Sequence, residues 1–250
     1  MSRYFLSQHS FACEAAGHAV FLDLKRDKYT AVAPEDLWVL RTAVQGWPAI
    51  QPTPPDDTTA TAIATAPAGT KQSRITTDVV DMLIKEGLVT ADASLGKAAT
   101  PPHLDAPTNT FLANPRLWPQ LTTRDLRNFI SVWAATTLML RTLPISWIAN
   151  RARRRKERLA ASAPPFDPRK AQLLTTIHFV LQPAFYSAKD ACLRNSLTLV
   201  EFLARYQIYP TWAFGVRMEP FAAHSWVQQG PVLFTDPIDH VKTFTPIMLI

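Results

Sequence analysis

Apolar positions in the last third of the chain follow two different periods. Over residues 193–206 they recur at spacings of three and four, as Leu197, Val200 and Leu203 illustrate, and this period predicts an amphipathic helix. Short β-rich runs bounded by turn residues come next and predict strands at 211–216, 222–228 and 232–234. This part of the chain therefore combines one helix with a small sheet.

The N-terminal part shows a second combination of strands and helices. Two β-rich runs, at residues 17–24 and 29–32, are separated by four charged residues and predict a hairpin. Pro34 with acidic residues directly after it is typical of a helix start, and the apolar pattern continues to Gly46. A last helix and a closing strand are predicted over residues 77–89. The whole chain is thus predicted to be of the α+β class.

Proline-rich segments divide the chain. The first, residues 48–74, is rich in Pro, Thr and Ala and is predicted as a loop inside an N-terminal domain of residues 1–96. The second is predicted as a linker over residues 97–120, before a domain of residues 121–250. Within that domain, residues 129–140 are apolar but fall short of the roughly 20 residues that span a bilayer. We expect a buried or docking helix there and no stable membrane insertion.

Composition narrows the possible chemistry. The chain has 250 residues, of which 47% are hydrophobic, enough for two modest cores. Its two cysteines, Cys13 and Cys192, offer neither a disulfide framework nor a metal-ligand spacing, so we expect no metal. The first residues lack the apolar core of a secretory signal, and a reduced cytoplasm is the expected location.

Charge is distributed unevenly. Residues 1–96 carry a net charge of −3 and residues 97–250 carry +9, which together give the total of +6. Much of the excess lies in the basic run Arg151–Arg158. This run is compatible with a solvated helix face, with an acidic partner, or with a nucleic-acid or membrane surface. Because it has no interleaved aromatic residues and no nucleic-acid motif, we expect no nucleic-acid binding.

The strongest chemical signal is the order Cys192, His224, Asp236. A thiol is an effective nucleophile as a thiolate, so it needs a nearby base and a third group that orients the base. Cys192 lies near the predicted helix start, where a thiolate is favoured. Each residue alone has an ordinary structural explanation, as a buried thiol, a strand histidine and a turn aspartate. Their order and surroundings together favour a catalytic triad on a papain-like or transglutaminase-like cysteine protease domain.

The residues around this triad resemble those of lasso-peptide B proteins. The similarity lies in Cys192-Leu-Arg-Asn-Ser-Leu, Gly215-Val and Phe221-Ala-Ala-His-Ser-Trp-Val. Two departures are visible: Arg194-Asn195 stands where the family more often has a spacer and Arg, and Ser225 stands where Ala is common. The strand–strand–helix order of the N-terminal part also resembles the small, winged-helix-like PqqD-like domain that recognises leader peptides.

The resemblance implies a function. Such proteins are cysteine peptidases that remove the leader of a ribosomally made precursor peptide, so that an ATP-dependent lasso cyclase can join the new amine to a side-chain carboxyl group. The precursor and the cyclase would be the partners, and the chain itself would need no cofactor. The leader would add as a strand to Tyr29-Thr30-Ala31-Val32, with Arg41 lining the adjoining groove.

Other functions remain compatible with the same residues. A Cys-His-Asp triad also serves transglutaminases and other acyltransferases, which pass the acyl group to an amine in place of water. A peptide-binding adaptor without catalysis would use Cys192 only structurally. A basic scaffold for nucleic acid is the weakest of these alternatives.

Overall fold

The computed structural model describes residues 4–47, 71–113, 119–185 and 192–250. Within them the chain divides into two compact units, Met1–Pro101 and Pro102–Ile250. Most of the loop predicted at 48–74 lies outside the described residues, but residues 71–74 belong to a helix. In the described part of the chain, no helix is long and apolar enough to cross a membrane.

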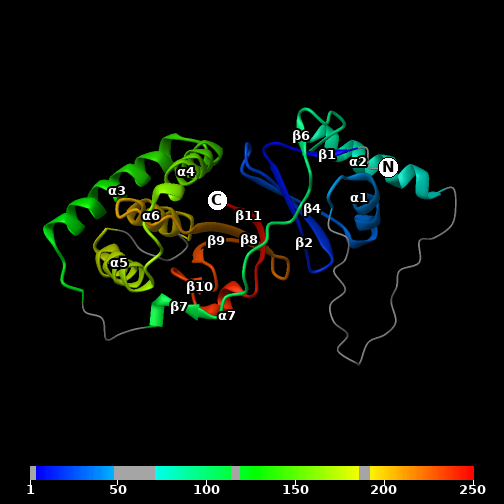
Figure 1. Cartoon of the computed structure of the whole chain (residues 1–250). Coiled ribbons are helices and arrows are strands. Elements are labelled where there is room, and N and C mark those ends of the chain that lie inside the picture. The colour runs from blue at the N-terminus through cyan, green and yellow to red at the C-terminus, as the bar shows by residue number, and fades with distance from the viewer. Residues whose placement is uncertain (1–3, 48–70, 114–118, 186–191) are drawn as a thin grey trace, which may run out of the picture. The chain divides into compact units, whose positions relative to one another are not determined.

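The first unit is built from two three-stranded sheets with helices (Figure 1). One sheet has the order β2-β3-β4 and the other the order β5-β1-β6. The strands are β1 Phe5–Ser7, β2 Ser10–Ala15, β3 His18–Asp23, β4 Lys28–Val32, β5 Val89–Thr90 and β6 Gly96–Lys97. The helices are the short 3₁₀ turn η1 Pro34–Asp36, α1 Leu37–Ala43 and α2 Lys71–Lys85. The predicted hairpin is therefore present as β3 and β4, and β2 extends it to an antiparallel meander.

The core of this unit lies between the meander and its helices. Phe21 of β3 and Leu40 of α1 are fully buried there, together with Leu83 of α2. Phe21 also packs against Trp47, with their ring centroids 5.5 Å apart. A helix that buries one apolar stripe on a sheet face is the ordinary solution for a small α+β unit.

The second unit combines a five-stranded sheet with a group of helices. The strand order is β11-β8-β9-β10-β7. The strands are β7 Asn109–Thr110, β8 Thr211–Arg217, β9 Ala222–Gln229, β10 Val232–Leu233 and β11 Thr245–Leu249. The helices are α3 Thr123–Thr142, α4 Ile145–Leu159, α5 Pro168–Leu181, α6 Cys192–Ala204 and α7 Ile238–Val241, with 3₁₀ turns η2 Phe111–Ala113, η3 Ala160–Ser162 and η4 Gln182–Ala184. The segment predicted as a linker thus contributes β7, which pairs in parallel with β10.

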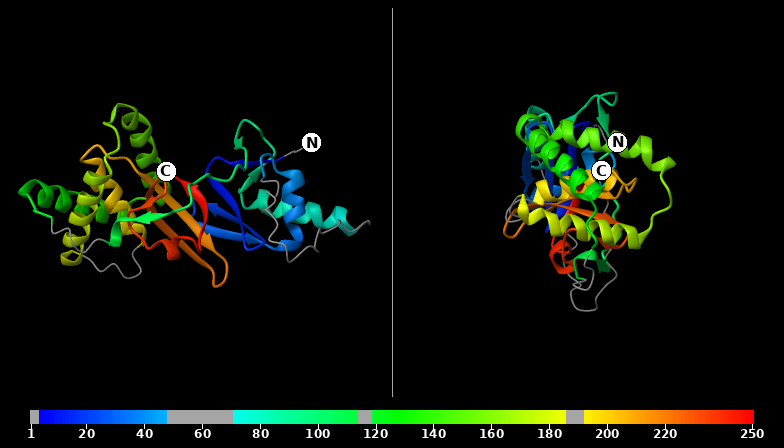
Figure 2. Two further views of the ribbon diagram at one scale, coloured as in Figure 1. Left: turned by 60° about the horizontal axis from the view of Figure 1, so that its bottom comes forward. Right: turned by 90° about the vertical axis from the view of Figure 1, so that its left-hand side faces the viewer.

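Helix α6 is central in this unit. It packs against α3 and α5 and also against β8 and β9, and Figure 1 shows it between these helices and the sheet. Figure 2 shows the same unit from two further directions. Eight consecutive residues of α6, from Ser196 to Leu203, are buried. The first residue of α6, Cys192, is therefore held by a rigid element beside the sheet.

Candidate active site

Cys192 is placed by the start of α6. It is the first residue of this helix and is partly buried. The first turn of a helix leaves backbone N–H groups without intrahelical partners, and the helix dipole is positive there. Both effects favour a thiolate over a thiol.

His224 is placed by β9, opposite Gly215 of β8 in the antiparallel register. Its Nε2 lies 2.8 Å from Oδ1 of Asp236, which leaves Nδ1 for its hydrogen bond with the Cys192 thiol. The imidazole stacks nearly parallel to the Trp226 ring, at an interplanar angle of 12°. The ring of His224 is thus fixed in both position and orientation.

Asp236 follows β10 and is buried, with 8% of its surface exposed. The oxygen that does not face His224 accepts a hydrogen bond from the Thr235 hydroxyl. The backbone carbonyl of Asp236 accepts one from Oγ1 of Thr110, 2.9 Å away. The carboxylate is therefore held from both its side chain and its backbone, as the orienting group of a triad must be.

The electrostatics of the site favour an ion pair between Cys192 and His224. The hydrogen bond with His224 lowers the pKa of the Cys192 thiol against the opposing effect of burial. Burial also opposes charge on His224, but hydrogen bonds to Asp236 and Cys192 outweigh it and raise the pKa of His224 to about 9. A thiolate beside an imidazolium is the reactive form of a cysteine nucleophile.

Cys13 provides the contrast. It lies in β2 with 2% of its surface exposed, and burial raises the pKa of its thiol to about 12. A thiol in that environment is inert at neutral pH. The two cysteines of the chain therefore differ in environment as a structural and a reactive thiol do.

The residues predicted to bind a peptide lie in the first unit. Tyr29, Thr30, Ala31 and Val32 belong to β4, which is an edge strand of the meander. Among the described residues, no strand pairs with the outer edge of β4. Thr30 donates a hydrogen bond to Glu86, 3.2 Å away at the end of α2, so the end of this helix lies beside the same strand.

Arg41 takes a different position. Its guanidinium lies 2.7 Å from a carboxylate oxygen of Glu14 in β2, and Glu14 also accepts a hydrogen bond from the Trp47 indole. Because β3 separates β2 from β4, the structure does not bring the Arg41 head group together with Tyr29–Val32. Its engagement with Glu14 is structural, between α1 and the sheet.

A metal-binding arrangement overlaps the candidate triad. Within the described residues, His224, Asp236 and His240 have possible ligand atoms within 4.8 Å of one another. Two of these residues are already joined by a hydrogen bond. An ion bound there would replace the hydrogen bond between Nε2 of His224 and Asp236, so the group is best understood as part of the thiol site.

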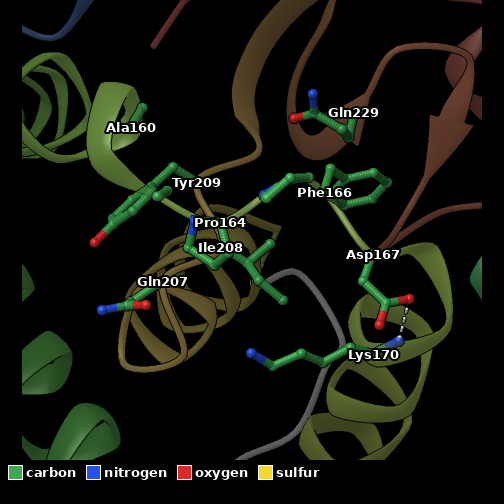
Figure 3. Close-up of a pocket in the computed structure, with 11 residues that line it drawn as sticks. Ala160, Pro164, Phe166, Asp167, Lys170, Gln207, Ile208, Tyr209 and Gln229 are labelled. Carbon is green, nitrogen blue, oxygen red and sulfur yellow. Dashed lines mark hydrogen bonds between the residues drawn. The ribbon is translucent and has the colours of Figure 1, made fainter.

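A pocket of about 320 Å³ lies elsewhere in the second unit. Figure 3 shows Phe166, Ile208 and Tyr209 among the residues that line it. Ile208 and Tyr209 follow the C-terminal end of α6, whereas Cys192 begins it, and a helix of 13 residues separates the two ends by roughly 20 Å. Two of its polar residues already have partners, since Asp167 caps α5 and the Lys170 ammonium donates to the Tyr206 carbonyl. The pocket is therefore not the site of the thiol chemistry.

The sequence did not reveal two residues that contact this centre. Ser225 contributes through its backbone and its side chain to the lowered pKa of Cys192, and its hydroxyl lies 3.0 Å from that of Ser196. In the sequence, Ser225 appeared only as a departure from the alanine common in lasso-peptide B proteins. Thr110, which holds the Asp236 backbone, lies in the segment predicted as a linker, and no motif in the sequence indicated its role.

Comparison with known proteins gives one match. Residues 139–249 match the family model described as Transglutaminase-like superfamily. No curated protein and no solved structure matches the chain. The matched range includes Cys192, His224 and Asp236, and domains of this superfamily are generally cysteine-based catalysts. The C-terminal part of this α+β chain therefore contains a transglutaminase-like superfamily domain.

Proposed function

We propose that this chain is a cysteine peptidase that binds and removes the leader of a ribosomally made lasso-peptide precursor. One observation carries the catalytic part of this proposal: the Cys192 thiol, at the start of α6, is bonded to His224, whose other nitrogen is held by Asp236. The resemblance of the flanking residues to lasso-peptide B proteins supports the choice of substrate.

The chemistry follows from the arrangement of these groups. The Cys192 thiolate attacks the carbonyl carbon of the scissile bond, and the tetrahedral intermediate collapses to a thioester while His224 protonates the departing amine. The freed amine belongs to the core peptide. Water, deprotonated by His224, then hydrolyses the thioester and releases the leader as a carboxylic acid. Asp236 holds the imidazole and stabilises its charged form throughout.

The N-terminal unit supports the recognition part of the proposal. An extended leader would add to the outer edge of β4 through backbone hydrogen bonds, and side-chain pockets beside that edge would give selectivity. This role makes the unit a PqqD-like recognition domain. The precursor would then be one partner, and the lasso cyclase that uses the freed amine would be the other, in the cytoplasm.

The test uses the purified full chain and the precursor peptide encoded next to its gene, with mass spectrometry of the products. We expect wild type to release the leader and Cys192→Ala to leave the precursor intact while still binding it. A parallel reaction adds the cyclase, the proposed partner that would use the freed amine. Leader release by Cys192→Ala at the wild-type rate would refute the assignment of the nucleophile.

The same experiment separates hydrolysis from acyl transfer. A primary amine added in excess would capture the thioester if the site passes its acyl group to amines, as a transglutaminase does. The product would then be an amide of the leader, heavier than the free acid by the mass of the amine less water. We expect the free acid, and a dominant amide product would instead support the acyltransferase function.

A further inference from the structure

Arg217 lies on the face of the β8–β9 hairpin that also carries His224. It is the last residue of β8 and stands two residues beyond Gly215, which is directly opposite His224 in the register. Residues two apart on a strand point to the same face, and such diagonal neighbours across a strand pair lie roughly 7–8 Å apart. The long side chain of Arg217 can therefore reach the surroundings of the imidazole.

Phe244 contacts both of these side chains. The guanidinium carbon of Arg217 lies over the Phe244 ring, 5.3 Å from its centroid. The centroid of the same ring lies 5.1 Å from that of the His224 imidazole, and Phe244 is buried. Because Phe244 directly precedes β11, which pairs with β8, the sheet fixes its place. The positive charge of Arg217 is thus held one ring away from the base of the proposed triad.

The guanidinium of Arg217 has no carboxylate partner among the described residues. Its Nε is buried and makes no hydrogen bond there, and no acidic side chain of that part of the chain forms an ion pair with it. Arg155 provides a contrast, because it also buries an unpaired Nε but is bound to Glu201. Phe244 attracts the cation of Arg217, yet its ring offers no lone pair to the N–H donors.

An unpaired guanidinium in this position indicates a binding site for an anion. A buried donor without a partner destabilises the folded chain, so such a group in a native structure requires an explanation. A carboxylate matches it best, because the planar fork of a guanidinium donates two parallel hydrogen bonds to one carboxylate. Arg217 as a whole is only half-buried, so an anion can approach it from solvent. In the proposed reaction, the peptide that reaches His224 brings such a group to this face.

We propose that Arg217 is a specificity-determining residue that binds a carboxylate group of the peptide substrate beside the scissile bond. This inference rests on the proposed function, because it assigns a substrate contact within the same thiol site. A cation close to the imidazolium of His224 is unfavourable by itself, and a bound carboxylate offsets that repulsion.

The first test measures the charge near the thiol and needs no peptide. The full chain is alkylated in parallel with iodoacetate, whose carboxylate mimics the proposed ligand, and with neutral iodoacetamide, and modification of Cys192 is followed by mass spectrometry. Both reagents react with the thiolate, so the ratio of their rates does not depend on the pKa of Cys192. We expect Arg217→Met to lower the ratio of iodoacetate to iodoacetamide rates about threefold, because it removes one unit charge near the thiol.

Matched variants separate the charge of Arg217 from its packing. Arg217→Lys keeps the charge and should keep the ratio close to the wild-type value. Arg217→Gln removes the charge with a polar side chain and should repeat the result of Arg217→Met, which covers the case in which the methionine variant does not fold. Arg205→Met removes the same charge at an exposed position beyond the C-terminal end of α6, opposite the end that carries Cys192. Its ratio should equal that of wild type.

The second test locates the carboxylate within the peptide. KM and kcat for leader release are measured with the precursor, with versions in which each Asp or Glu is replaced singly by Asn or Gln, and with a version amidated at its C-terminus. We expect one of these changes to raise the wild-type KM about tenfold with little effect on kcat, since it removes a charge-assisted hydrogen bond. The same change should leave the KM of Arg217→Met unaltered. Its position then shows whether the carboxylate is a side chain or the terminus.

The results that would overturn the inference fall into two kinds. An unchanged reagent ratio on removal of the Arg217 charge, an equal change in Arg205→Met, or the absence of any peptide change whose effect depends on Arg217 would leave Arg217 only a packing role beside Phe244. The proposed nucleophile would then stand. If Cys192 of wild type reacted with both reagents no faster than an ordinary thiol, the thiolate itself would be refuted, and the proposed function would fail together with this inference.

Discussion

His224 and Cys192 set the pH range over which the proposed reaction can run. Cleavage needs the Cys192 thiolate and a protonated His224, so the rate should rise through the lowered pKa of Cys192 and fall as His224 loses its proton near pH 9. We therefore predict a bell-shaped profile of kcat/KM for leader release. Activity that is still rising at pH 10 would contradict the assignment of the imidazolium as the acid.

His178 gives a prediction for stability. It is fully buried among Phe129, Phe179 and Phe202, and burial lowers its pKa to about 3. Because the ordinary pKa of histidine is 6.5, the unfolded chain binds up to one more proton than the folded chain between pH 6.5 and 3. Stability should therefore fall with falling pH, by at most about 1.4 kcal/mol per pH unit. Chemical unfolding of His178→Phe should show a weaker pH dependence, whereas His103→Gln, at an exposed position, should resemble wild type.

These residues differ in how far the sequence reveals them. The triad was recognisable because each member lies in a distinctive local context, and its order along the chain is informative. The residues around His178 do not reveal that it is buried. A histidine on the apolar face of a helix gives the same hydrophobic pattern in the sequence whether its side chain is exposed or buried. The pairing of Ser196 with Ser225 joins positions 29 residues apart, and only the packing of α6 on β9 brings them together.

The hairpin of β8 and β9 depends on the small size of Gly215. A Cβ added there would meet two ring carbons of Trp226 at 2.8 Å and the backbone oxygen of Thr245 at 2.9 Å. Gly215 also lies directly opposite His224. We expect Gly215→Ala to destabilise the protein by about 1–3 kcal/mol and to lower the rate of leader release, measured by chemical unfolding and by mass spectrometry. Wild-type values for both would show that the hairpin can expand at this point.

Helix α4 is held to α6 by ion pairs of the basic run. Arg151 and Arg155 both contact the carboxylate of Glu201, whose side chain is only 8% exposed. Removing Glu201 leaves Arg155 mostly buried without its partner, so we predict that Glu201→Gln lowers the free energy of unfolding by about 3 kcal/mol. Arg154→Gln, on the exposed side of α4, is the control and should change it little. Equal changes in the free energy of unfolding for the two variants would show that these ion pairs contribute nothing beyond surface charge.

The described elements show which helices and strands can be predicted from the hydrophobic periodicity of the sequence and which cannot. The predicted helix at 193–206 is α6, and the predicted strands at 211–216, 222–228 and 232–234 are β8, β9 and β10. Strands of two residues such as β7 carry no period to detect. Their presence follows from a distant pairing, here between Asn109 and Val232, which no window along the sequence contains.

At the scale of the whole molecule, the two units differ in charge as well as in fold. Met1–Pro101 has 9 Lys and Arg against 11 Asp and Glu, and Pro102–Ile250 has 17 against 9. The thiol, its base and its orienting carboxylate all lie in the second unit. The strand proposed to bind the leader lies in the first. Recognition and chemistry should therefore be separable by dividing the chain.

The properties of the truncated enzyme should depend on where the chain is divided. A chain of residues 102–250 keeps Thr110, which holds the backbone of Asp236, and Phe111, whose ring lies 4.8 Å from that of Phe234. We predict that its Cys192 is alkylated with the wild-type pH profile, while KM for the precursor rises because the leader-binding strand is absent.

A chain of residues 121–250 loses both contacts and the β7 pairing, so Asp236 is released and the raised pKa of His224 should fall. Alkylation of Cys192 would then shift to higher pH. Identical profiles for the two truncated chains would show that the segment before residue 121 is only a linker, and a wild-type KM for residues 102–250 would remove the first unit from leader recognition.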